Sequence, residues 1–215
     1  DGDANYGGEW GHGSFNFMNG WFAQTSRYTT VRAMGSYDGN ICYCIEPGVP
    51  QESGDRYTKK GENFWDNYPS SYNKTISPDD IKLFIGRIMQ YGYTGTISTS
   101  WRSQNEGGDK LAHAVATQLL IWETVVGERD ADFNKVSTGG KDAILDQISP
   151  NHPLHSKIMS YYNSIAASVQ THSKVPSFFA KSTGKAKNIE LEWDGEKYTA
   201  TGQDKWHSTV IDKML

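Results

Sequence analysis

The sequence predicts an α+β fold in which a helical lobe is inserted into a β-rich lobe. Three observations predict it. Aromatic and β-branched runs fill the first third of the chain, apolar residues recur at helical spacing in the middle third, and the last third returns to strand-like runs. We expect a single domain over residues 1–215, with the β lobe at about 12–76 and 173–215 and the helical lobe at about 77–172.

Composition excludes several classes of protein. The chain has 215 residues, a formal net charge of −4 and 13% aromatic residues, which argues against disorder. It has no run of lysine and arginine, so we expect no nucleic-acid partner. No apolar stretch approaches the length of a membrane span.

Strands are expected at residues 14–22 and 28–34 because β-branched and aromatic residues are concentrated there. Asp38-Gly39 follows and is a strong hairpin signal, since glycine accepts a positive φ. The returning strand is expected at residues 40–46. In the last third, residues 176–180 are a candidate strand, and a second hairpin is expected around Asp194-Gly195.

The chain has two cysteines, Cys42 and Cys44, on one face of that returning strand together with Glu46. Residues i and i+2 of a strand lie roughly 6.6 Å apart, near the upper limit for a disulfide. A bridge closing so short a loop would also stabilise little. At least one cysteine is therefore expected to serve chemistry or packing.

Residues 49–76 are polar and are expected to form a long loop, which contains a glycosylation sequon at Asn73. Ser77 begins a helix, because a capping serine is followed by proline and two aspartates, and Gly92 ends it. Further helices are expected at 109–127, at 141–148 and from Pro153 onward.

The helix at 109–127 carries one residue that does not match its face. At 100° per residue, one stripe contains Leu111, Val115, Gln118, Trp122 and Val125. Burying an unpaired amide costs about 1–3 kcal/mol, so Gln118 either finds hydrogen-bond partners or is chemically modified. Cys44 leaves a similar choice between a small buried hydrophobe and a reactive thiol.

Three segments resemble a known family. Residues 43–48, Tyr-Cys-Ile-Glu-Pro-Gly, resemble the cysteine motif of the thioester domains of Gram-positive surface adhesins. Residues 116–122, Ala-Thr-Gln-Leu-Leu-Ile-Trp, are similar to the glutamine motif of that family, and 91–95, Tyr-Gly-Tyr-Thr-Gly, to the segment that precedes it. The glutamine follows the cysteine by 74 positions, and the resemblance covers about residues 16–179.

The resemblance implies a bond between Cys44 Sγ and the side-chain carbonyl carbon of Gln118, formed with loss of ammonia. It implies a β-sandwich- or barrel-like lobe with an inserted helical lobe and the thioester at their interface. Such domains are extracellular and sit at the tips of wall-anchored virulence proteins, as monomers within a larger chain. Some attach covalently to a host extracellular or cell-surface protein, fibrinogen being one target.

The implied reaction is acyl transfer to a lysine amine, which releases the Cys44 thiol. It occurs once, so the domain is not a turnover enzyme and needs no cofactor or metal. Trp122 and Tyr93 are the residues expected to keep water away, and Glu46 is the expected proton acceptor. His113 lies about 140° from Gln118 around the helix and is poorly placed as a base. Cys42 is an addition to the family pattern.

Alternatives remain open at this stage. Cys44 with a histidine could be the nucleophile of a cysteine hydrolase or transglutaminase. The chain could instead be a non-covalent ligand-binding adhesin module with an ordinary cysteine and glutamine. A zinc site is a weaker alternative, because His152 with His155 and Cys42 with Cys44 make incomplete ligand sets.

Overall fold

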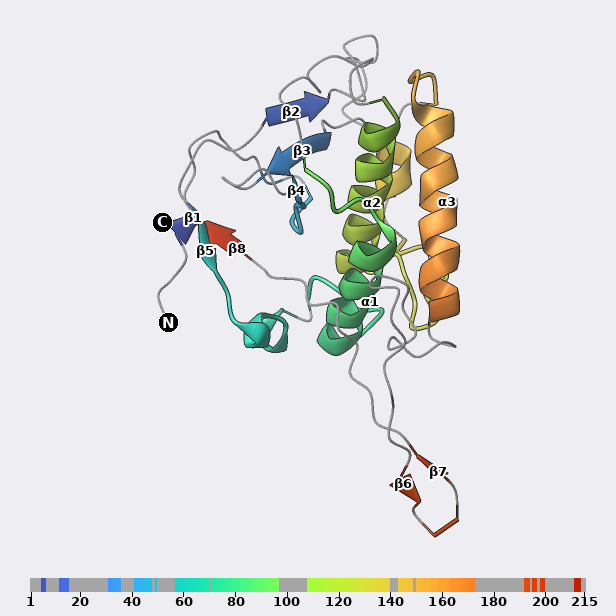
Figure 1. The fold of residues 1–215 in the computed structure, drawn as a ribbon. Helices are drawn as coiled ribbons and strands as arrows, with labels where there is room; N and C mark the ends of the chain where they lie inside the picture. The colour runs from blue at the N-terminus through green and yellow to red at the C-terminus, as the bar shows by residue number, and fades with distance from the viewer. Residues whose placement is uncertain are drawn as a thin grey trace.

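A computed structural model describes residues 5–6, 12–15, 31–35, 41–47, 49, 57–69, 71–96, 108–139, 143–148, 150–172, 192–193, 195–196, 198–199 and 211–213. Within these ranges three α-helices pack against one another, with short strands beside them, and the hairpin of Glu192–Trp193 with Tyr198–Thr199 lies apart from the helices (Figure 1). Helix α2 (Gly108–Val125) packs against α1 (Pro78–Tyr91), α3 (His155–His172) and strand β3 (Val31–Gly35), so it is the central element of this part of the chain. None of the described helices is long and apolar enough to cross a membrane.

Helix α1 spans Pro78–Tyr91 and confirms the predicted start and stop. Ser77 Oγ accepts a hydrogen bond from the Asp80 backbone N–H at 3.2 Å, and the Asp80 carboxylate accepts one from the Ser77 N–H at 3.3 Å. This reciprocal capping satisfies two N-terminal donors that the helix leaves unpaired. Gly92 ends the helix, and its N–H donates to Ile88 O at 2.7 Å.

Helix α2 spans Gly108–Val125 and is buried on nearly all sides. The predicted apolar stripe is buried, and so are the residues between its members except His113, which is partly buried. A helix that is apolar all round belongs inside a fold rather than on its surface. Each fully buried leucine or isoleucine stabilises the fold by about 1.5–3 kcal/mol, so α2 anchors the core. Helix α3, His155–His172, packs along it.

The segments around these helices differ from expectation in two places. The stretch predicted as a loop at 49–76 contains strand β5, Tyr57–Lys59, and the 3-10 helix η2, Glu62–Asn67. Trp65 in η2 is 2% exposed and lies edge-on to Phe64, so aromatic packing orders a segment whose polar composition indicated a loop. The helix predicted at 141–148 is one 3-10 turn, η4, Ile144–Gln147.

The described strands form small antiparallel sheets. One has the order β1–β5–β8, which places Asn5–Tyr6 and Ile211–Lys213 on either side of β5. Another has the order β2–β3–β4, from His12–Phe15, Val31–Gly35 and Ile41–Cys42. The antiparallel pairing of β3 with β4 agrees with the predicted hairpin, although Asp38-Gly39 lies outside the described residues.

The second hairpin is confirmed. Strand β6, Glu192–Trp193, pairs with β7, Tyr198–Thr199, and Gly195 between them has φ +101°. The strand expected at 176–180 and most of residues 14–22 lie outside the described residues. A sandwich- or barrel-like β lobe, with the boundaries given above, stays a prediction.

Candidate functional site

The Gln118 side chain contacts the backbone of Cys44. Gln118 is 2% exposed on α2. Its Oε1 accepts a hydrogen bond from the Cys44 N–H at 2.8 Å, and its Nε2 donates one to Cys44 O at 2.7 Å. Both polar atoms of the buried amide are therefore paired with one residue 74 positions away. Because Cδ is bonded to both Oε1 and Nε2, these two contacts hold the carbonyl carbon against the residue that carries the thiol.

This contact also explains why the strand is shorter than predicted. Strand β4 ends at Cys42, so Cys44 and Glu46 do not share a strand face with it. The Cys44 N–H and C=O pair with the Gln118 amide rather than with a neighbouring strand. A side-chain amide has the same donor and acceptor as a peptide group, so Gln118 takes the place of a strand partner.

The Cys44 sulfur lies in a turn made by the residues that follow it. The thiol donates to Glu46 O at 3.2 Å, and the Glu46 N–H points back to Sγ at 3.4 Å. The side chain is half-buried, and this burial raises the pKa of the Cys44 thiol above its ordinary value. The Glu46 backbone and the Trp122 indole lower this pKa, whereas the charge of the Glu46 carboxylate raises it. Cys44 is therefore a thiol at neutral pH.

Trp122 and Glu46 both lie near the Cys44 sulfur. Trp122 is 6% exposed and lies one turn after Gln118. Its indole N–H is buried and makes no hydrogen bond within the described part of the chain. The Glu46 side chain is exposed, so its carboxylate is open to solvent beside the thiol.

Tyr93 is placed differently from the other predicted residues. Its hydroxyl donates to Thr96 O at 2.6 Å, and its ring lies over Gly95 and edge-on to His113. Its backbone is the part that supports the site, because the Tyr93 N–H donates to Thr117 Oγ1 at 2.9 Å. No hydrogen bond of the Tyr93 side chain to Cys44 or Gln118 is present.

Tyr43 and Thr117 were not singled out from the sequence, although they directly precede Cys44 and Gln118. The Tyr43 hydroxyl donates a short hydrogen bond to Tyr93 O, and burial raises its pKa. Thr117 Oγ1 donates to His113 O at 2.8 Å and accepts from the Tyr93 N–H. Position within the two motifs was the signal that could have identified them.

The tyrosine-glycine segment joins the two halves of the site. A Cβ on Gly92 would lie 2.5 Å from Thr117 Cγ2, so α1 and α2 approach this closely only with glycine there. Gly95 O accepts from the Ile41 N–H at 3.3 Å. Residues 91–95 therefore connect the start of β4 to α2 next to Gln118 and fix the distance between them.

The remaining predicted groups lie elsewhere. His113 stacks on Tyr161 at 4.4 Å, its Nε2 is 3.3 Å from Tyr91 O, and burial lowers its pKa. No described histidine hydrogen-bonds the Cys44 sulfur. Cys42 and Cys44 form no disulfide. Within the described ranges, no group of histidine, cysteine and acidic residues could hold a metal ion.

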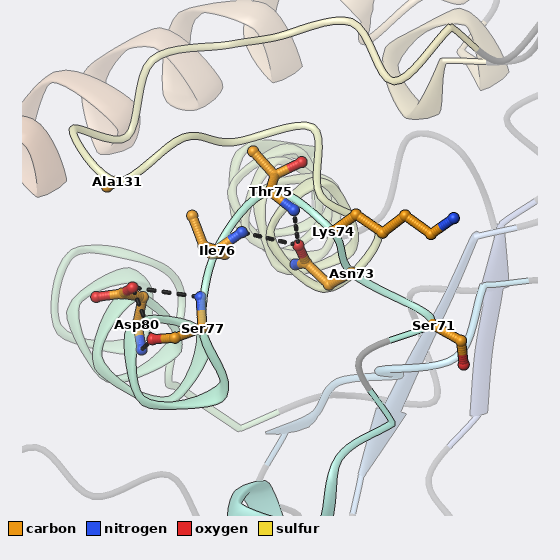
Figure 2. A pocket seen from close by; sticks show the side chains of 8 residues that line it. All are labelled: Ser71, Asn73, Lys74, Thr75, Ile76, Ser77, Asp80 and Ala131. Carbon is orange, nitrogen blue, oxygen red and sulfur yellow. Dashed lines mark hydrogen bonds between the residues drawn. The ribbon is translucent and has the colours of Figure 1, made fainter.

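An open depression of about 590 Å³ lies between the segment before α1 and Ala131 (Figure 2). Its polar groups bond to one another: Asn73 Oδ1 accepts from the Thr75 and Ile76 N–H groups, and Ser77 pairs with Asp80. None of the predicted site residues lines it.

The family model for thioester domains matches residues 41–171, which is more than half of the chain. The chain therefore belongs to the thioester domain family. A search of curated proteins and a search of solved structures gave no match. Membership indicates a surface adhesion domain that attaches covalently through an internal thioester, rather than a turnover enzyme.

Proposed function

We propose that Cys44 and Gln118 form an internal thioester that acylates a lysine amine of a host extracellular or cell-surface protein. The observation that supports this most directly is the pair of hydrogen bonds between the Gln118 amide and the Cys44 backbone. Family membership supports the same pairing, since both residues lie within the matched range.

Thioester formation follows from these contacts. The Cys44 sulfur attacks Gln118 Cδ, the C–S bond forms, the C–N bond breaks, and ammonia leaves with the proton of the thiol. Negative charge develops on Oε1, which already accepts from the Cys44 N–H at 2.8 Å. A donor positioned at a developing oxyanion lowers the barrier of acyl transfer. Cys44 O holds the leaving nitrogen in place through its hydrogen bond with Nε2.

Amine capture reverses the direction of attack. A neutral amine adds to Cδ from the position that Nε2 occupied, the C–S bond breaks, and the Cys44 thiol is released. Only about one lysine in a few thousand is neutral at pH 7, so a proton acceptor is needed. The exposed Glu46 carboxylate fills that role, because its own backbone contacts the sulfur. The amide product keeps one N–H for Cys44 O.

We further propose that the domain works at the cell surface, as a monomer within a wall-anchored virulence protein of a Gram-positive bacterium. A fibrinogen-like protein is the kind of target that the family suggests. The alternatives depend on different chemistry. A hydrolase would need a base for Cys44, and His113, His152 and His172 bond elsewhere. A non-covalent module would leave Gln118 unmodified.

Intact mass spectrometry tests the thioester. The parent protein should weigh one ammonia less than its sequence, and methylamine should add to Gln118, as located by peptide mapping. Cys44→Ala should abolish both signals, whereas Cys42→Ala should keep them. A parent protein of unmodified mass that takes up no methylamine would disprove the proposal, and reversible binding of a ligand by that protein would favour the non-covalent module.

A further inference from the structure

The Trp122 indole N–H is a polar group that the fold leaves unsatisfied. The side chain is 6% exposed, and Nε1 makes no hydrogen bond within the described residues. Buried donors are nearly always paired, because an unpaired one loses its bond to water without a replacement. This donor is therefore available to an acceptor that forms beside it.

The surroundings of the sulfur identify that acceptor. Cys44 Sγ has the Glu46 N–H at 3.4 Å. The Trp122 indole is close enough to favour the thiolate, whereas burial and the Glu46 carboxylate disfavour it. Trp122 lies one turn after Gln118 on the same rigid helix. The carbon that is attacked and the indole donor are thus held by one element, facing one cysteine.

We propose that the Trp122 indole N–H donates a hydrogen bond to the Cys44 sulfur as negative charge develops on it, which makes Trp122 a catalytic residue in both thioester formation and amine capture. This inference rests on the proposed function. In capture, the amine N–Cδ bond forms, the Cδ–S bond breaks, and the electron pair leaves on sulfur. The proton lost by the amine finally neutralises the thiolate.

The donor acts selectively because the acceptor changes during the reaction. A thioester sulfur is a weak acceptor, whereas a thiolate is a strong, charged one. A hydrogen bond that strengthens only as the C–S bond breaks stabilises the transition state more than the ground state, and it therefore raises the rate. The unsatisfied state of the indole in the resting protein is what this role requires.

Trp122→Phe tests the inference in a Cys42→Ser background, where Cys44 is the single thiol. Phenylalanine keeps an aromatic ring and removes the N–H. Capture of methylamine should slow by about 10-fold or more. After methylamine treatment, the pH profile of thiol alkylation should show a higher pKa for Cys44 than in the Trp122 parent. Trp65→Phe removes another buried indole, 2% exposed, and should change neither readout.

The outcomes separate this inference from the proposed function. A Trp122→Phe protein that forms the thioester and captures methylamine at the parental rate, with an unchanged thiol pKa, overturns the catalytic role but leaves the thioester intact. Faster hydrolysis with an unchanged thiol pKa shows a water-excluding role and also overturns it. A parent without a thioester refutes the proposed function itself.

If Trp122→Phe does not fold, benzothienylalanine incorporated at position 122 gives a second test. This residue has the shape of tryptophan with sulfur in place of N–H. It should reproduce the slower capture and the higher thiol pKa. Parental values for both would overturn the inference.

Discussion

Two buried polar side chains on α2, five residues apart, are satisfied in different ways. Gln118 is 2% exposed and bonds to the backbone of one residue, Cys44. Glu123 is fully buried and binds three side chains. Arg129 donates to it at 2.9 and 2.7 Å, Tyr162 at 2.8 Å and Lys135 at 3.0 Å.

The network around Glu123 is complete. Arg129 also donates to Phe133 O at 2.9 Å and lies 4.7 Å from the centre of the Phe133 ring. Phe133 has φ +62°, a left-handed conformation that a bulky residue adopts only when its surroundings hold it. The region of Gln118 differs because the indole N–H of the neighbouring Trp122 makes no hydrogen bond within the described residues. Burial alone therefore does not distinguish the two sites, whereas their partners do: Glu123 binds charged and hydroxyl side chains, and Gln118 binds the backbone of a cysteine.

The largest effect on stability is expected from Arg129→Met. This change leaves the Glu123 carboxylate buried without its main partner, and it should lower the free energy of unfolding by about 3–5 kcal/mol. Lys135→Met is the matched control, since Lys135 is 38% exposed and its pair contributes at most about 1 kcal/mol. Urea unfolding measures both. Similar losses for the two variants would contradict a structural core at Glu123.

Gln118→Met tests the contribution of the two hydrogen bonds between the Gln118 amide and the Cys44 backbone. It removes both bonds to Cys44 and should cost about 1–3 kcal/mol relative to the methylamine-opened parent, which has no cross-link. Methylamine uptake should disappear completely. Gln170→Met, on α3, removes an amide that donates to Asn134 Oδ1 at 3.1 Å and should leave uptake unchanged. Uptake that survives in Gln118→Met would show that the acyl group lies elsewhere.

Gly92→Ala tests how tightly the reactive side of α2 is positioned. The new Cβ would meet Thr117 Cγ2 at 2.5 Å and Ile88 O at 2.7 Å. We expect a loss of about 1–2 kcal/mol from overpacking, and a smaller fraction of protein with the thioester by intact mass. Gly61→Ala has no atom within 4 Å of its Cβ and serves as control. Equal behaviour of the two variants would show that α1 and α2 can separate without harm.

The smallest effect on the free energy of unfolding is expected from lowering the pH, through His152. Burial and the nearby His155 lower the pKa of His152, whose Nδ1 accepts from the Leu154 N–H at 3.0 Å. Neutral His152 therefore contributes to the free energy of unfolding. This contribution is fully present above the unfolded pKa of about 6.5 and is lost as the pH falls through the lower pKa of the folded protein. His152→Asn keeps an acceptor for the same N–H but does not titrate. Its unfolding free energy should depend less on pH between 7 and 5, by about 1 kcal/mol or less; an identical slope would refute the assignment.

Local signals in the sequence were enough for helices α1 and α2 and for singling out Gln118, whereas the pairing of Gln118 with Cys44 was predicted from the family resemblance. Ser77 with Asp80 gave the start of α1, because capping depends on residues three apart. Gln118 stood out because an amide occupied an apolar stripe, and the structure brings its side chain to Cys44. The cross-link itself stays a prediction until its mass is measured.

Features that depend on distant contacts were missed. Strand β4 was predicted to reach Glu46, but the Gln118 amide takes the hydrogen bonds of Cys44 that would continue it. Strand β5 pairs with Asn5–Tyr6 and Ile211–Lys213, which are remote in sequence, so residues 49–76 read as a loop. That the Trp122 indole N–H makes no hydrogen bond within the described residues likewise follows only from the positions of its neighbours in the structure.

The burial of Asn73, the acceptor of the glycosylation sequon, has a consequence for producing the protein. The Asn73 side chain is 4% exposed, and Nδ2 donates to Thr124 O at 2.8 Å at the end of α2. Thr75, the other defining residue of the sequon, donates from Oγ1 to Gly127 O at 2.7 Å. An oligosaccharide attached to Asn73 before folding would have no space against α2. Production through the secretory pathway of a eukaryotic cell should therefore yield either native protein without sugar or glycosylated protein that fails quality control.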